Sequence, residues 1–270
     1  MSGLTVRRHG ETGPVVIVLH GGPAAAGEAG PLARGLADGF QVLEPWQRGS
    51  GAVPLTVARH VADLQKIVEE CGGDRPALVG ESWGAMLALA YAAAHPGSAG
   101  PLALVGCGTF DTAARARMRE ILDERQDDGL RRRLEALRPE TGDSERLREM
   151  YELMAPLYDC DAEPTAPDPE APAFDARAHT ETWNDMLRLQ AEGVYPAAFA
   201  AIRGPVLMLH GSHDPHPGRM IRDGLTPHIP QLEYHELDRC GHSPWRERRA
   251  RDAFFAVLRA WLARRTSGTA

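Results

Sequence analysis

The sequence predicts an α/β fold in which a mainly parallel sheet carries helices on both faces and a helical insertion interrupts the chain. Short apolar runs alternate with helical patterns through the first hundred residues, which is typical of βαβ units. Residues 111–200 contain no convincing strand pattern, and the α/β alternation returns afterwards. With 270 residues, the chain is long enough to bury one large core and carry such an insertion.

The predicted strands are short apolar runs with the length and composition of buried parallel strands. In chain order they cover residues 15–19, 40–43, 77–79, 102–105, 205–209 and 232–237. The first run, Val-Val-Ile-Val-Leu, is the clearest, whereas the run at 40–43 is weaker and the last alternates like an edge strand.

Helices are predicted between these strands. Apolar residues recur at helical spacing after Thr56, which is expected to cap a helix that ends at Gly72 and Gly73. An alanine-rich run predicts a second helix over 85–94, which ends before Pro96. A final amphipathic helix is expected near the end of the chain.

We therefore predict a core domain formed by residues 1–110 and 201–270, with residues 111–200 inserted as a helical cap. Within the insertion, four prolines predict an irregular stretch over residues 160–175, which could serve as part of a lid or as a plain surface connection. The sequence leaves the cap residues that set specificity undetermined.

The composition excludes several classes of partner. A formal net charge of −7 gives no nucleic-acid footprint, and the cluster Arg131-Arg132-Arg133 is interleaved with acids as on a solvated helix face. No apolar run approaches a membrane span or a signal-peptide core, so no membrane association and a cytoplasmic location are expected. The four cysteines are widely separated and are interpreted as reduced.

The most informative motif is Gly80-Glu81-Ser82-Trp83-Gly84, which lies where a predicted strand ends and a predicted helix begins. Alone, such a pattern recurs by chance in a glycine-rich chain. In this context it predicts a nucleophile elbow, in which the serine takes a strained conformation and the glycines let strand and helix approach closely. Ser82 is thus the candidate nucleophile.

A serine nucleophile needs a base and a group that orients the base. Asp214 follows the strand at 205–209 and is the candidate acid, while His242 follows the last predicted strand and is the candidate base. His213 and His216 flank the acid and are expected to point elsewhere. A metal site built from them with Asp214 is disfavoured, because the three residues crowd one proline-bearing loop. Cys240 is a weaker candidate nucleophile because nothing orients it.

An oxyanion hole is predicted at His20-Gly21-Gly22-Pro23, which follows the first strong strand. The backbone amide of Gly22 is expected to act with that of Trp83 as the pair of oxyanion donors. The plain alternative is an ordinary glycine-rich turn.

Together these motifs, with Gln47-Arg48-Gly49-Ser50-Gly51, resemble the α/β-hydrolases and, more closely, the proline iminopeptidase branch of that superfamily. The resemblance covers most of the chain outside residues 111–200. It implies an α/β-hydrolase fold with a helical cap, Ser82, Asp214 and His242 as catalytic triad, and Gly22 and Trp83 as oxyanion donors.

Two departures from the branch stand out. Trp46 replaces its usual aspartate, and Glu81 stands where a glycine is frequent. Glu81 either touches substrate or anchors the elbow, and the anchor is favoured. An iminopeptidase must also bind a free amine with carboxylates, for which Glu181, Asp185 and Glu192 are available but carry no recognisable motif.

The sequence thus predicts a serine hydrolase that cleaves an ester or amide of a small molecule through an acyl-enzyme intermediate, without cofactor or metal. Proline iminopeptidase activity ranks next. The alternatives on the same fold are a non-hydrolytic small-molecule binder, a carbon–carbon bond hydrolase and a biosynthetic cyclase. Substrate identity and oligomeric state stay open.

Overall fold

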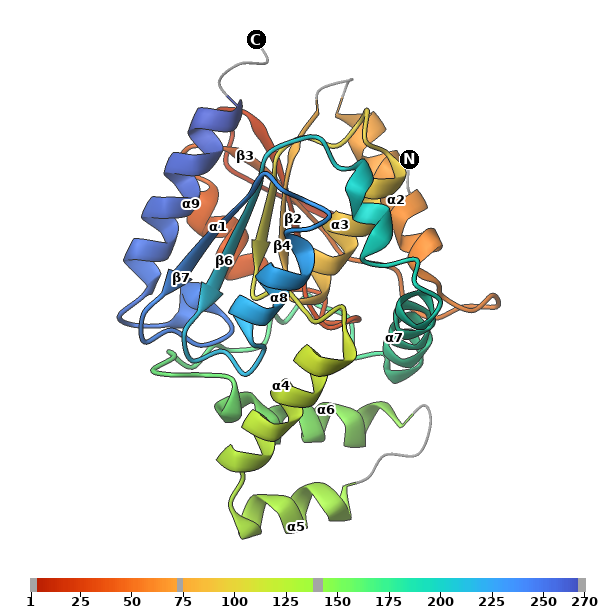
Figure 1. The fold of residues 1–270 in the computed structure, drawn as a ribbon, viewed down its shortest axis with the longest axis vertical. Helices are drawn as coiled ribbons and strands as arrows, with labels where there is room; N and C mark the ends of the chain where they lie inside the picture. The colour runs from red at the N-terminus through yellow and green to blue at the C-terminus, as the bar shows by residue number, and fades with distance from the viewer. Residues whose placement is uncertain (1–3, 72–74, 138–142, 267–270) are drawn as a thin grey trace.

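A computed structural model describes residues 4–71, 75–137 and 143–266. Its centre is a seven-stranded sheet with strand order β1-β3-β2-β4-β5-β6-β7 over these residues, parallel except where β1 pairs with β3 (Figure 1). The strands are β1 (Val6–His9), β2 (Val15–Leu19), β3 (Gln41–Pro45), β4 (Ala77–Glu81), β5 (Leu102–Val105), β6 (Val206–Gly211) and β7 (Leu232–Leu237).

The sheet confirms all six predicted strands, with β3 beginning one residue later and ending two later than expected. The residues of β4, β5 and β6 are buried throughout, as expected of central parallel strands covered on both faces. The sequence analysis did not predict β1, because its charged side chains interrupt the apolar pattern of a strand. Its Arg7 donates two hydrogen bonds to the buried carboxylate of Glu44 on β3, which explains why this polar edge strand forms.

Helices pack on both faces of the sheet. The core helices are α1 (Gly30–Leu36), α2 (Val57–Glu70), α3 (Trp83–Ala94), α8 (Gly218–Leu225) and α9 (Arg251–Thr266). Alternate residues of β2 face opposite sides: Ile17 and Leu19 pack in one core with residues of α2, α3 and α8, whereas Val16 and Val18 pack in the other with α1 and α9. The domain is therefore a three-layer α/β sandwich.

The helix ends follow the predicted signals where these can be seen. Thr56 accepts the amide of Arg59 as the N-cap of α2. The helix α3 ends at Ala94, before Pro96. Gly72 and Gly73, expected to end α2, lie outside the described residues.

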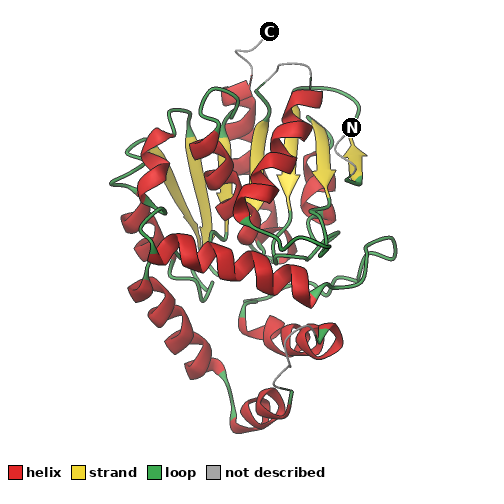
Figure 2. Cartoon of the chain, turned by 90° about the vertical axis from the view of Figure 1, so that its right-hand side faces the viewer, coloured by secondary structure: helices red, strands yellow, loops and turns green. Residues whose placement is uncertain are grey.

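Residues 111–200 contribute the helices α4 (Thr112–Arg125), α5 (Asp128–Ala136), α6 (Ser144–Met154) and α7 (Ala176–Ala191), with short 3₁₀ turns at Ala155–Leu157 and Ala197–Ala201. Figures 1 and 2 show these helices beyond the end of the sheet toward which the strands of the core point. No residue of α5 is buried, so the arginine cluster at 131–133 lies on a solvated helix as expected. The division into core and cap, with a cap function, stays a prediction.

The stretch 160–175 has no helix and only one isolated bridge, between Ala162 and Glu247, as the prolines predicted. It is nevertheless anchored. The carboxylate of Glu247 accepts the backbone amides of Cys160 and Asp161, and Asp168 pairs with Arg7. Among the described residues, no helix is long and apolar enough to cross a membrane.

Candidate active site

Ser82 occupies a sharp turn between β4 and α3. Its backbone angles, φ 53° and ψ −114°, fall in a strained region that non-glycine residues rarely adopt. The turn requires small neighbours: a Cβ on Gly80 would lie 2.2 Å from the carbonyl oxygen of Gly84, and a Cβ on Gly84 would lie 2.3 Å from that of Leu19. The Ser82 amide donates to the carbonyl of Val105 at 2.8 Å, which fixes the turn to β5. This strained turn is the geometry expected of a nucleophile elbow.

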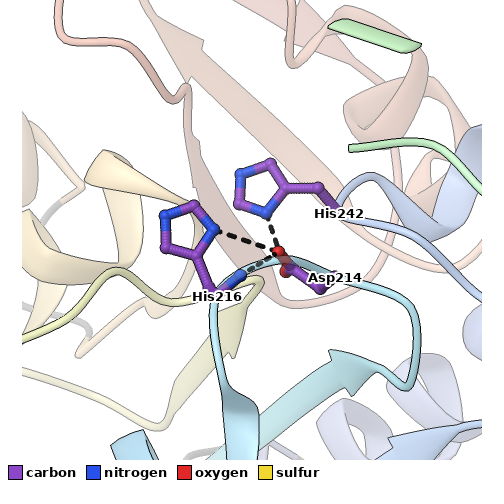
Figure 3. A group of neighbouring side chains, drawn as sticks. All are labelled: Asp214, His216 and His242. Carbon is purple, nitrogen blue, oxygen red and sulfur yellow. Dashed lines mark hydrogen bonds and ion pairs between the residues drawn. The ribbon is translucent and has the colours of Figure 1, made fainter. Parts of the chain in front are cut away.

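The structure brings Asp214 and His242 together. Asp214 follows β6, His242 follows β7, and Nδ1 of His242 lies 2.7 Å from Oδ2 of Asp214 (Figure 3). Burial would raise the pKa of Asp214, but the neighbouring imidazoles of His242, His210 and His216 hold it well below its usual value. The aspartate is therefore ionised, and because a carboxylate only accepts hydrogen bonds, Nδ1 of His242 carries the proton. Nε2 is left as the basic nitrogen.

The environment of His242 makes it a stronger base than a free imidazole. Burial alone would lower its pKa, but the charge and hydrogen bond of Asp214, with a contribution from Glu81, raise it to about 9. Gly106 provides the room for the ring, since a Cβ there would lie 3.0 Å from Nδ1. The backbone amide of His242 donates to the carbonyl of Tyr158 at 2.9 Å, so the histidine loop is tied to the segment that follows α6.

Glu81 connects Ser82 to this imidazole. Its Oε1 lies 3.6 Å from Nε2 of His242, so the residue directly before the serine reaches the nitrogen that would accept the serine proton. Among the described residues the Ser82 hydroxyl makes no hydrogen bond to His242. Such bonds often tighten only when substrate binds.

Glu81 also anchors the neighbouring loop. Its carboxylate packs closely on the backbone of Gly21, since a Cβ on Gly21 would lie 2.2 Å from Oε2. The side chain is buried, and burial raises its pKa while the nearby His242 opposes that rise. The anchoring role favoured from the sequence is thus joined by a direct contact with the imidazole.

The glycine loop after β2 is held by a small hydrogen-bond network. Gln47 donates its backbone amide to Nε2 of His20 at 3.0 Å and accepts from the indole of Trp83 at 2.7 Å. Nε2 is therefore an acceptor, and Nδ1 of His20 donates to the carbonyl of Gly21 at 2.9 Å. Burial lowers the pKa of His20 to about 4, which keeps it neutral.

This network places the loop that carries Gly22 beside the start of α3. Gly22 has a φ of +109°, which a glycine adopts without strain. The N-terminus of α3 adds a partial positive charge at the elbow. The roles of Gly22 and Trp83 as oxyanion donors stay predictions.

The expectation that His216 points away from the acid is wrong. Its Nδ1 lies 3.0 Å from Oδ1 of Asp214, and its ring stacks on that of His242 with centroids 4.7 Å apart (Figure 3). Nε2 of His210, the last-but-one residue of β6, also lies 3.1 Å from Oδ2. The run Asp-Pro-His-Pro at residues 214–217 could have indicated this contact in the sequence, because its two prolines restrict the loop and hold the histidine near the aspartate.

The group Asp214, His216 and His242 is compact enough to suggest a metal site, since its ligand atoms lie within 4.8 Å of one another. The ring geometry does not fit one. The two imidazoles are stacked with an angle of only 20° between their planes, so their in-plane lone pairs do not converge on one point. Each Nδ1 instead faces its own oxygen of Asp214. The arrangement is that of a proton-sharing network.

Cys240 lies in this region but is buried. Burial raises the pKa of its thiol, which disfavours the thiolate that a cysteine nucleophile needs. The adjacent Gly241 donates its amide to Glu247 at 2.9 Å. Cys240 therefore belongs to the framework of the histidine loop.

A family model described as "Alpha/beta hydrolase family" matches residues 16–257. The chain belongs to this family of hydrolases. A proline iminopeptidase of Neisseria gonorrhoeae is 39% identical over 113 residues, which cover 37% of this chain and 36% of that protein. The aligned part is thus little more than a third of the length of that relative.

Solved structures of α/β-hydrolases match over nearly the whole chain. One from Sphaerobacter thermophilus has a TM-score of 0.66 at 26% identity and covers 96% of this chain and 95% of its own. A proline iminopeptidase from Mycobacterium smegmatis also has a TM-score of 0.66, at 19% identity, and covers 98% of this chain and 96% of its own. At that identity the second comparison shows the α/β-hydrolase fold alone.

Proposed function

We propose that this α/β-hydrolase is a serine hydrolase that cleaves an ester or amide of a small molecule through an acyl-enzyme intermediate. The observation that carries the proposal is the 2.7 Å hydrogen bond between His242 and Asp214 at the sheet edge where Ser82 is held in a strained turn. The net charge of the chain, −7, fits a small-molecule substrate better than a nucleic acid.

In the proposed mechanism the Ser82 oxygen attacks the substrate carbonyl while Nε2 of His242 takes the serine proton. Asp214 holds the Nδ1–H tautomer and stabilises the imidazolium. The backbone amides of Gly22 and Trp83 donate to the oxyanion of the tetrahedral intermediate. Its collapse breaks the bond to the alcohol or amine, which leaves with the proton from His242.

Deacylation repeats these steps with water. Nε2 of His242 takes a proton from the water as its oxygen attacks the acyl carbonyl, and the proton then passes to the Ser82 oxygen as the acid is released. The chemistry calls for no cofactor, because every proton and electron pair moves between substrate, water and these side chains.

Labelling with a fluorophosphonate tests the nucleophile. The wild-type protein is expected to form one covalent adduct, Ser82→Ala is expected to form none, and Ser50→Ala, which alters an exposed serine, is the matched control. Mass spectrometry of the labelled peptide identifies the residue. An adduct that persists in Ser82→Ala would overturn the assignment.

The acids of α7 favour a simple ester or amide over an N-terminal proline. Glu181 accepts the backbone amide of Leu55, and Asp185 accepts that of Val57, each at 2.8 Å. Both carboxylates thus hold α7 against the start of α2, and neither is left for a substrate amine. Glu192 forms an ion pair with Arg188.

One observation supports iminopeptidase activity as the second candidate. The carboxylate of Glu28 has no hydrogen bond or ion pair within the described residues, and it interacts electrostatically with Glu81, Arg246 and His242. The residue is exposed, yet the protein around it desolvates the carboxylate and, with the charge of Glu81, raises its pKa to about 7. A carboxylate without a hydrogen bond or ion pair that interacts electrostatically with His242 is available to bind a free amine.

A substrate panel separates the candidates. Nitrophenyl esters of short acyl chains are expected to be cleaved faster than proline nitroanilide if the first candidate holds, and the reverse order favours the second. Tight binding of a small molecule with no turnover of either substrate would favour a non-hydrolytic binder. Cleavage of a carbon–carbon bond or a cyclisation would favour the remaining alternatives.

A further inference from the structure

Asp214 is hydrogen-bonded on both of its carboxylate oxygens. Nδ1 of His242 lies 2.7 Å from Oδ2, and Nδ1 of His216 lies 3.0 Å from Oδ1. The backbone amide of His216 donates to the same Oδ1 at 2.9 Å. Because an ionised carboxylate only accepts, the imidazoles of His242 and His216 each present a proton on Nδ1. Together with Nε2 of His210, which lies 3.1 Å from Oδ2, they share the charge of a single aspartate.

The two imidazoles are also packed on one another. Their ring centroids are 4.7 Å apart and their planes differ by 20°. Tyr158 closes the stack, with its ring centroid 5.5 Å from that of His242 and 5.9 Å from that of His216. The ring of His242 therefore has a flat surface on one side that limits its rotation about the hydrogen bond to Asp214.

His216 is itself held rigidly. It stands between Pro215 and Pro217, which fix the backbone φ angles on either side of it. Its carbonyl oxygen accepts from Nε2 of His210 at 2.9 Å. Burial lowers the pKa of His216 despite the adjacent aspartate, so the ring is neutral at the pH where His242 acts.

From these contacts we propose that His216 is a positioning residue for His242: it holds the second oxygen of Asp214, supports the ring of the base, and limits how much of the negative charge of Asp214 acts on that base. The inference rests on the proposed function, in which His242 is the general base.

Other titratable and charged groups also surround Asp214, His216 and His242 and affect how these three residues titrate. Those that interact electrostatically with Asp214, His216 or His242 are His210, His213, Glu81, Glu28, Asp159, Tyr158, Arg125, Cys107 and Cys240. The test therefore changes only residue 216 and measures the pKa of His242 and the kinetic constants relative to wild type.

Two variants separate the two contributions of His216. His216→Phe keeps an aromatic ring against His242 but removes the Nδ1–H donor, so more of the charge of Asp214 acts on His242. His216→Asn keeps an amide donor near the position of Nδ1 but removes the stacked ring. The first variant probes charge sharing, and the second probes mechanical support.

The readout is the titration of the His242 imidazole by NMR in histidine-labelled protein, assigned by the signal lost in His242→Gln. We expect His216→Phe to raise the pKa of His242 by about one unit, as loss of one charge-sharing donor implies, and to move the acid limb of kcat/KM by the same amount. We expect His216→Asn to leave the pKa near wild type and to lower the plateau of kcat by about 10- to 100-fold, the scale of a misplaced catalytic group.

An unchanged His242 pKa in His216→Phe, with thermal stability intact, would overturn the charge-sharing role. An unchanged kcat in His216→Asn would overturn the support role. The NMR titration needs no turnover, so it tests the coupling even if the protein does not hydrolyse the ester panel. Failure of the proposed function would show separately, as absence of a fluorophosphonate adduct on the wild-type protein or as an adduct that persists in Ser82→Ala.

Discussion

The carboxylate of Glu81 faces the imidazole of His242 across 3.6 Å, between Oε1 of the first and Nε2 of the second. Asp214 binds the opposite nitrogen of the same ring. The imidazole thus lies between two carboxylates, one of which belongs to the residue that precedes Ser82 in the chain. This arrangement accounts for the raised pKa of His242 and leads to the first prediction.

Activity should rise with pH up to about 9, because His242 accepts a proton only when Nε2 is unprotonated and Asp214 and Glu81 raise its pKa to about 9. Below that value kcat/KM is expected to fall about tenfold per pH unit. Glu81→Gln removes one nearby negative charge, which lowers the pKa of His242 and moves this acid limb down by about one unit. A pH–rate profile of both proteins checks this, and coincident acid limbs would contradict it.

If the second candidate function holds, we expect Glu28 to bind the cationic group of the substrate. Glu28→Gln removes a carboxylate that interacts electrostatically with His242 and should then lower kcat/KM for proline nitroanilide by about 10- to 100-fold, the scale of a lost charge-assisted contact. Cleavage of neutral nitrophenyl esters should change little. The matched control is Glu192→Gln, which alters an acid already paired with Arg188 on α7. Equal losses on both substrates would argue against an amine-binding role.

The elbow tolerates no side chain at Gly84. A Cβ there would lie 2.3 Å from the carbonyl oxygen of Leu19 and 2.8 Å from that of His20, both backbone atoms that cannot give way. Gly84→Ala should therefore destabilise the fold by about 3 kcal/mol or more despite the better helix propensity of alanine. This corresponds to a fall in Tm of at least about 5 °C.

Gly97→Ala is the control for this prediction, because a Cβ at Gly97 meets nothing within 4 Å. Calorimetry of the two variants gives the comparison. A Gly84→Ala protein as stable as Gly97→Ala would mean that the close contact of β2 with α3 is not maintained in solution.

Glu247 joins the histidine loop to the helical segment. Its buried carboxylate accepts the backbone amides of Gly241, Cys160 and Asp161. Glu247→Ala leaves these three donors without their acceptor, and each buried donor left unpaired costs about 1–3 kcal/mol. We expect a lower Tm and faster proteolysis within residues 158–163.

Glu170→Ala is the control, because it alters an exposed acid elsewhere in the stretch 160–175. It should change neither the Tm nor the rate of proteolysis. Limited proteolysis with peptide mapping locates the cleavage in each variant. Resistance of Glu247→Ala equal to that of wild type would show that other contacts suffice to hold the stretch.

Local patterns were sufficient for most of the sheet. The strands β2, β4, β5 and β6 appear as apolar runs because both faces of a central parallel strand are buried. The edge strand β7 appears instead as an alternation of partly buried and exposed residues. β1 escaped prediction because Arg7 and Arg8 interrupt its pattern. The partners of Arg7, which are the buried Glu44 on the adjacent strand β3 and Asp168, explain why an arginine is stable there. A partner 37 residues away leaves no trace in a local pattern.

The order of motifs along the chain was sufficient to predict that Ser82, Asp214 and His242 follow strands whose carboxyl ends share one edge of a parallel sheet. Turn chemistry and strand order are local enough to be read along the chain. Three contacts could be seen only in the folded protein: Glu81 faces His242, His216 stacks on His242, and the carboxylates of α7 hold the start of α2. The physical reason is that such contacts depend on distances and ring orientations between distant segments, and a polar residue has the same local pattern whether it binds substrate, a backbone amide or another side chain.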